Sequence, residues 1–99
     1  MKEQIKIVAE FTLKKGTADK IKPIFAAVVK GSQAEDGCVY YNIHKDINDT
    51  TDTKYVMIET WKNQEAINKH NLTPHFKTFL QESEPYFEST RVLLLKEIY

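Results

Sequence analysis

The sequence contains a single cysteine, Cys38, among its 99 residues. One thiol excludes an internal disulfide and every metal site that is built from clustered cysteines. Long hydrophobic runs are lacking as well, and stretches such as VLLL at 92–95 are far too short to span a bilayer. The opening MKEQIKIVAEF has no hydrophobic segment before a cleavage site, so we expect no secretion signal. The default expectation is a cytoplasmic protein.

An excess of charge of either sign is also absent. The chain has 14 basic and 14 acidic residues, and these are scattered rather than grouped in blocks. A nucleic-acid surface or an anionic membrane surface would need clustered lysine and arginine. The sequence further lacks a phosphate loop, a glycine-rich nucleotide fingerprint, a Ser-His-Asp order and paired catalytic carboxylates. We expect no nucleic-acid partner and no membrane partner.

The composition is nevertheless that of a folded protein. Apolar residues make up 41% of the chain, with one tryptophan, five tyrosines and five phenylalanines. This is enough for a hydrophobic core and unlike a disordered composition. The length predicts one domain over residues 1–99, and the sequence shows no internal repeat, linker or low-complexity segment.

Alternation of apolar and polar residues predicts four strands. Helical spacing predicts one helix that begins near Thr17 and a second helical unit that is broken in two. Pro23 requires either a distorted first turn or a later start of the first helix. Thr73 and Pro74 fit an N-cap followed by proline at the first helical position. The predicted strands are 5–13, 38–46, 54–61 and 89–99, and the second unit comprises 62–70 and a helix from Pro74 to Pro85.

The order βαββαβ predicts an α+β, ferredoxin-like fold, with a four-stranded antiparallel sheet and helices on one face. Several predicted strands carry apolar residues on both sides, as in Val8 against Ile7 and Ile58 against Met57. Two helices cover only one face, so the other face would leave an apolar patch in water. We therefore expect a homodimer in which the two sheets pack face to face.

His70 and His75 are the sharpest candidates for chemistry. Zinc ligands on one helix stand four residues apart, whereas these histidines are five apart with Pro74 between them. We therefore expect no metal site. His75 falls in the first turn of a helix, where the helix dipole favours a neutral imidazole that can act as a general base. The alternatives are that His70 caps a helix end and that His75 is simply exposed.

Glu59 lies in an apolar strand, on the same side as Tyr55 and Trp61 if the strand is regular. A carboxylate in such surroundings needs a partner or a wet cavity, and His70 or Arg91 could be that partner. Tyr41, Tyr55 and Trp61 could wall a pocket for a flat aromatic ligand, and the alternative is that they are core residues.

The strings EDGCVYYNIHKD and YVMIETWKNQEAINKHNLTPHFKTF together resemble the antibiotic biosynthesis monooxygenase (ABM) domain family. The matching features are the E-x-G-C turn, the E-x-W at the end of the third strand, and two histidines bracketing a T-P step. Within that family the chain is most similar to small quinol monooxygenases. The opening IKIVAEFTLKKGTADKI also looks like the family's first strand and helix start, so the resemblance covers nearly the whole chain.

The resemblance implies a dimeric α+β barrel with a pocket in each subunit, and oxidation of an aromatic quinol by O₂ without a metal, flavin or haem. In that reading His75 or His70 is the base and Trp61 orients the substrate ring. Glu59 and Asn42 would hold a polar substituent. The haem-degrading branch places an asparagine on the first strand, where this chain has Val8, Ala9 and Glu10, so haem degradation is disfavoured.

The fold also serves other chemistry, so a non-oxidative protein remains an alternative. It would be an isomerase of a small phosphorylated carbonyl compound, or a ligand-binding dimer without turnover. A pocket lined by Arg91, lysine and histidine rather than by apolar rings would favour the phosphorylated substrate.

Overall fold

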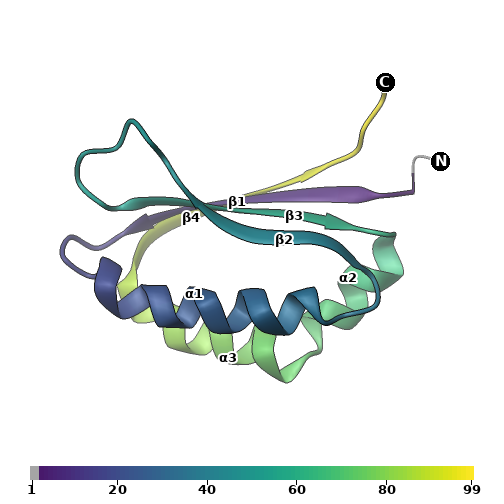
Figure 1. Cartoon of the computed structure of the whole chain (residues 1–99), viewed down its shortest axis with the longest axis horizontal. Helices are drawn as coiled ribbons and strands as arrows, with labels where there is room; N and C mark the ends of the chain where they lie inside the picture. The colour runs from purple at the N-terminus through teal and green to yellow at the C-terminus, as the bar shows by residue number, and fades with distance from the viewer. Residues whose placement is uncertain (1–2) are drawn as a thin grey trace.

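Four antiparallel strands form one sheet, and the helices lie against one of its faces (Figure 1). The computed structural model describes residues 3–99. The order of elements within this range confirms the predicted α+β, ferredoxin-like fold. The elements are β1 (Ile5–Leu13), α1 (Ala18–Gln33), β2 (Cys38–Lys45), β3 (Lys54–Trp61), α2 (Gln64–Asn71), α3 (Pro74–Ser83), the 3₁₀ turn η1 (Glu84–Tyr86) and β4 (Phe87–Leu95).

The strand order β2–β3–β1–β4 places the first strand of the chain in the middle of the sheet. Residues directly opposite each other in an antiparallel pair point to the same face. Ile7 lies opposite Glu59 on β3 and opposite Leu94 on β4. Tyr41 on β2 also lies opposite Glu59. These four side chains therefore share one face of the sheet, the face that carries the helices.

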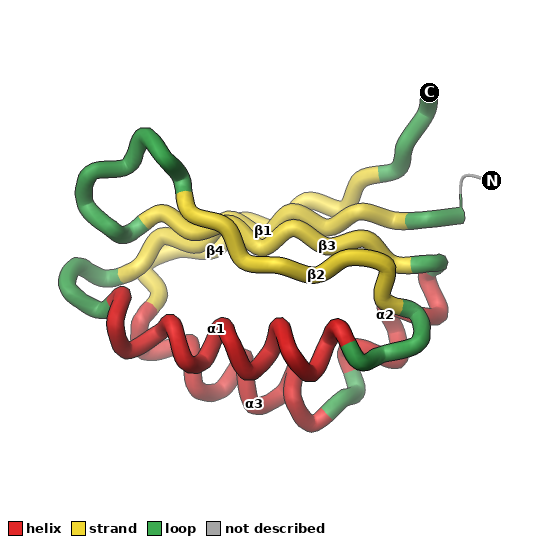
Figure 2. The backbone as a smooth tube through the Cα atoms, in the orientation of Figure 1, coloured by secondary structure: helices red, strands yellow, loops and turns green. Residues whose placement is uncertain are grey.

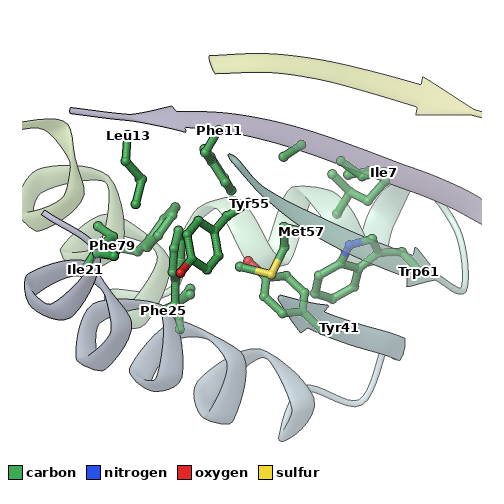
Figure 3. Close-up of a cluster of buried hydrophobic side chains, with 14 of the residues drawn as sticks. Ile7, Phe11, Leu13, Ile21, Phe25, Tyr41, Tyr55, Met57, Trp61 and Phe79 are labelled. Carbon is green, nitrogen blue, oxygen red and sulfur yellow. The ribbon is translucent and has the colours of Figure 1, made fainter. Parts of the chain in front are cut away.

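An aromatic cluster fills the space between this face and helices α1 and α3 (Figure 3). The ring of Phe11 on β1 stacks on that of Phe87, with 4.6 Å between centroids. Phe25 on α1 and Phe79 on α3 pack against Phe11 at 5.6 Å and 6.0 Å. Aromatic pairs at such separations add to the stability gained by burial. The cluster therefore holds both helices to the sheet.

Several predicted boundaries are wrong, and the largest differences are in the last strand and in the helix predicted at 62–70. The last strand spans Phe87–Leu95 rather than 89–99. Leu95 pairs with Lys6, and β1 begins at Ile5, so only one residue of β1 remains to pair with the chain after Leu95. Figure 2 shows the chain leaving the sheet after β4. The helix predicted at 62–70 begins at Gln64, because the Asn63 side chain accepts a hydrogen bond of 2.9 Å from the Ala66 amide and caps the helix there.

Helix α1 begins directly after Thr17 and continues through Pro23, so the alternative of a later start is wrong. Pro23 is exposed, which keeps its ring away from the sheet. The predicted N-cap of α3 is confirmed, since the Thr73 hydroxyl accepts a hydrogen bond from the Phe76 amide.

The opposite face of the sheet is apolar along its middle. Val8 lies between Ile58 on β3 and Leu93 on β4, and all three side chains are only partly buried. No helix of the described range covers this face (Figure 1). Within residues 3–99, every helix is too short or too polar to span a bilayer.

Candidate active site

A cavity of about 290 Å³ lies between the sheet and helices α2 and α3. Glu59 and His70 line it, and no lysine or arginine of the described residues does. Small-molecule sites are typically apolar with a few polar groups that fix the ligand, and this cavity has that character. The apolar part of the wall includes Ile7, Ala9, Met57, Ile67, Phe76 and Val92.

A second hollow lies beside Glu35 and is somewhat more open to solvent. Its lining is charged, with Asp36 and Glu65 facing Lys62 and Lys69. The more apolar and less open of the two hollows is therefore the better candidate for a small-molecule site.

Glu59 is 6% exposed, and it reaches the cavity from β3. Its partner is Trp61, whose indole Nε1 donates a hydrogen bond of 2.9 Å to Oε1 of the carboxylate. The predicted partners, His70 and Arg91, are wrong. Residues i and i+2 of one strand point to the same face, which lets the Trp61 indole reach the carboxylate, whereas His70 and Arg91 contact Glu35 and Glu10. Burial raises the pKa of Glu59 to about 7, and the negative charge of Glu35 adds to the increase, whereas the Trp61 hydrogen bond opposes it.

This raised pKa predicts a pH dependence of stability. Between the ordinary carboxyl pKa of 4.5 and about 7, the folded state binds more protons than the unfolded state. Stability should therefore fall as the pH rises through this window, by at most roughly 3 kcal/mol for a shift of this size. Glu59→Gln should remove most of the slope in urea unfolding between about pH 5 and about pH 8. The exposed Glu65→Gln serves as the control, and an unchanged slope in Glu59→Gln would contradict the assignment.

His70 is 2% exposed and reaches the cavity from α2. Its ring packs between those of Trp61 and Phe76, with centroid distances of 4.5 Å and 4.6 Å. Nδ1 lies 2.7 Å from Oε2 of Glu35. Nε2 is buried and has no hydrogen-bond partner within residues 3–99. Burial lowers the pKa of His70 below 6.5, although the hydrogen bond to Glu35 opposes this effect.

The sequence patterns did not identify Glu35 as a member of the site. It lies in the turn after α1, and the same Oε2 atom that contacts His70 lies 2.9 Å from Nε2 of His75 on α3. His75 can lie in this position because residue 31 is a glycine. A Cβ on Gly31 would come within 2.6 Å of the His75 ring. One carboxylate oxygen thus joins α2, α3 and the turn after α1. The only sequence signal for it was the E-x-G-C turn.

Glu35, His70 and His75 place their ligand atoms within 4.8 Å of one another, so the residue types alone would suit a metal ion. However, a metal-bound histidine almost always has a partner for its second ring nitrogen, and Nε2 of His70 has none among the described residues. Both histidines are instead within hydrogen-bond distance of the carboxylate. We interpret the three residues as a hydrogen-bonded cluster.

The structure brings together Tyr41, Glu59, Trp61 and His70. Tyr41 lines the cavity, and its ring lies 5.5 Å from that of His70. Burial raises the pKa of the Tyr41 hydroxyl, which therefore remains protonated. Trp61 is 0% exposed and lies behind the cavity wall, where it contacts both acid–base groups.

The other predicted site residues lie away from the cavity. Asn42 pairs with Ile58 on the face of the sheet away from the helices, and at the open edge of β2 its side chain accepts a hydrogen bond from Gln33 at the end of α1. Arg91 lies on that face too, 3.7 Å from Glu10. The Tyr55 hydroxyl donates to Asp52, at the far end of the core. His75 is 25% exposed and reaches the cavity wall only through Glu35 and His70.

A family model described as antibiotic biosynthesis monooxygenase matches residues 4–82. The crystal structure of PA3566 from Pseudomonas aeruginosa superposes with a TM-score of 0.90 at 28% identity, over 100% of this chain and 98% of that chain. SnoaB, a cofactor-independent oxygenase from Streptomyces nogalater, has the same fold at 18% identity, with a TM-score of 0.85 over 98% of this chain and 95% of that chain.

A relative from Synechocystis, the uncharacterized protein sll1783, is 25% identical over 82% of this chain. The matched segment spans 54% of that relative's length, and the segment matched in YcnE from Bacillus subtilis spans 59% of its length. The matched segments thus cover little more than half of either relative.

Proposed function

Because the chain belongs to the antibiotic biosynthesis monooxygenase family, we propose that it is a monooxygenase that oxidises a small quinol-like aromatic compound with O₂. SnoaB, which has the same fold, is a cofactor-independent oxygenase, and this similarity supports a reaction that needs no metal, flavin or haem. The apolar wall and the volume of about 290 Å³ suit a small flat ring.

The observation that carries the proposal is the unpartnered Nε2 of His70. Buried polar atoms in folded proteins almost always have a hydrogen-bond partner. His70 also lines the cavity, and we propose that its Nε2 faces a bound phenolic hydroxyl, which would supply the missing partner. The lowered pKa keeps the imidazole neutral near pH 7, which is the state required of a base.

In the proposed reaction, Nε2 of His70 accepts the phenolic proton and the electron-rich phenolate reduces O₂. One oxygen atom enters the ring as a hydroxyl group and the other leaves as water, so a quinol and O₂ give a hydroxyquinone and water. The substrate supplies all four electrons, and no other reductant is needed. Glu59 hydrogen-bonds a polar substituent, and the apolar wall excludes bulk water from the reactive species.

Trp61 does not line the cavity, but it donates a hydrogen bond to Glu59 and packs against His70, and so positions both side chains. Asn42, Tyr55 and Arg91 lie outside the wall and take no part in this step. The alternative of a phosphorylated substrate is weakened, because no arginine or lysine of the described range lines the cavity.

The test is oxygen uptake by the purified protein after dialysis against EDTA, with a panel of reduced quinols. We expect uptake above the spontaneous rate, one O₂ consumed per quinol, and one atom of ¹⁸O from labelled O₂ in the product. Uptake that vanishes after EDTA treatment would mean that a metal is required. No stimulation with any quinol would refute the proposed reaction.

A second candidate rests on the presence of two acid–base groups in one cavity. His70 could remove a proton from a small uncharged hydroxycarbonyl compound while the Glu59 carboxyl, with its pKa of about 7, returns one. This isomerisation needs no oxygen. Deuterium incorporation from D₂O under nitrogen would support it, and strict dependence on O₂ would exclude it.

We further propose that two copies of the chain pair through the uncovered face of the sheet. Val8, Val56, Ile58 and Leu93 on this face would be removed from water in such a dimer. Val8→Glu should therefore shift the mass measured by light scattering from dimer to monomer. A wild-type mass equal to one chain would contradict this assembly.

A further inference from the structure

We propose that Glu35 is a positioning residue for the base, and that it fixes His70 in the tautomer whose Nε2 carries no hydrogen. This inference rests on the proposed function for its catalytic meaning, but the tautomer itself can be observed without a substrate. It also gives His75 a role other than that of base, because His75 anchors the carboxylate from outside the cavity.

The argument begins with what a carboxylate can do. An ionised carboxylate oxygen only accepts hydrogen bonds, so each ring nitrogen within hydrogen-bond distance of it must carry the hydrogen. Nδ1 of His70 lies 2.7 Å from Oε2 of Glu35 and is therefore the donor. A neutral imidazole has a single N–H. Since His70 is neutral near pH 7, its Nε2 is left with a free lone pair.

The position of His70 makes this choice of tautomer decisive. With the hydrogen on Nδ1, the buried Nε2 can take a proton from a substrate hydroxyl. With the hydrogen on Nε2, the same ring could only donate, and the base would be lost. In other enzymes, removal of the residue that holds the catalytic histidine in one tautomer lowers the rate by several orders of magnitude.

Glu35 is itself held in place from the other side. Its side chain is 15% exposed and comes from a turn, where an unrestrained carboxylate would sample several rotamers. Nε2 of His75 donates to the same oxygen at 2.9 Å. His75 can approach because Gly31 has no side chain. The second hydrogen bond therefore keeps Oε2 at Nδ1 of His70.

The charge of Glu35 also assists the proton transfer. When Nε2 accepts the phenolic proton, the imidazole becomes an imidazolium with hydrogens on both nitrogens. The carboxylate already lies against Nδ1 and stabilises this cation without being protonated itself. The proton on Nε2 then leaves with the oxygen atom that becomes water.

The experiment is a ¹⁵N NMR measurement of the histidine side chains at about pH 7.5, in EDTA-treated wild-type protein and in three variants. We expect His70 of the wild type to show a protonated Nδ1 and a bare Nε2. Glu35→Ala should shift His70 toward the mixture of tautomers of a free imidazole and lower kcat at least 10²-fold. Glu35→Gln, which still accepts a hydrogen bond but has no charge, should keep the tautomer and recover part of the rate.

The matched control is Glu65→Ala, which removes an exposed carboxylate paired with Lys69 on α2 and should change neither quantity. A wild-type His70 with its hydrogen on Nε2 would overturn the proposal, as would an unchanged tautomer in a folded Glu35→Ala protein. Displacement of the Nδ1 hydrogen by equimolar Zn²⁺ would overturn it in favour of a metal site. If no quinol is oxidised but the tautomer behaves as expected, the proposed function fails while the positioning role of Glu35 stands.

Discussion

Replacing His70 by glutamine is expected to lower kcat/KM for the quinol by about 10²- to 10⁴-fold, the range that a general base typically contributes. Glutamine has a similar reach and can still form a hydrogen bond with Glu35, but it has no lone pair basic enough to take the phenolic proton. The fold should survive, because the aromatic cluster around Phe11 and Phe25 does not involve this side chain. Steady-state oxygen uptake measures the loss.

The pH profile of the wild type makes this prediction sharper. Burial lowers the pKa of His70 below 6.5, so the base stays deprotonated at pH values where an ordinary histidine would be charged. The acid limb of kcat/KM should accordingly lie below pH 6.5, and it should be missing from the residual activity of His70→Gln. His44→Gln is the matched control, because His44 lies away from the cavity beside Tyr40. Full activity in His70→Gln would remove His70 from the mechanism.

Replacing Trp61 by alanine is expected to have the largest effect on stability, about 3–5 kcal/mol for truncation of a buried ring. Trp61 is 0% exposed and its ring packs against His70. The truncation also leaves the buried Glu59 carboxylate without its hydrogen-bond donor. A domain of this size has a total stability of only about 5–15 kcal/mol, so thermal unfolding should begin far below that of the wild type, as circular dichroism would show.

Trp61→Phe separates packing from hydrogen bonding, because it keeps most of the ring but removes the indole N–H. We expect a cost of about 1–3 kcal/mol, the penalty for a buried polar group left unpaired. In a Glu59→Gln background the same change should cost less, since no charge remains to be stabilised. Equal costs in both backgrounds would show that the charge of Glu59 adds nothing to its hydrogen bond with Trp61.

The fold could be predicted from the sequence because its signals are local. The strand predicted at 54–61 is confirmed at both bounds, since apolar alternation runs through the whole segment. Thr73 marks the start of α3 because a hydroxyl before proline satisfies the exposed amides of a first turn. The end of the last strand could not be predicted, because it depends on where the partner strand β1 begins.

The candidate site was less predictable, because its contacts join distant segments. Glu35 is 35 residues from His70 and 40 residues from His75, and no local pattern connects them. Alternation places Tyr41 and Asn42 on opposite faces, but only the pairing of Tyr41 with Glu59 shows which of them faces the helices. The strand position of Arg91 was likewise ambiguous until its pairing with Glu10 placed it away from the cavity.

The central place of β1 in the sheet has a consequence for the order of folding. β1 pairs with β4 through residues as far apart as Lys6 and Leu95, and contacts of such long sequence separation form slowly. β4 also supplies Thr90, Val92 and Leu94 to the cavity wall. A refolding chain should therefore regain its helical signal before its activity, and until β4 docks, β1 has an unpaired edge on which other chains can aggregate. Catalytic competence would be acquired only in the final step of folding.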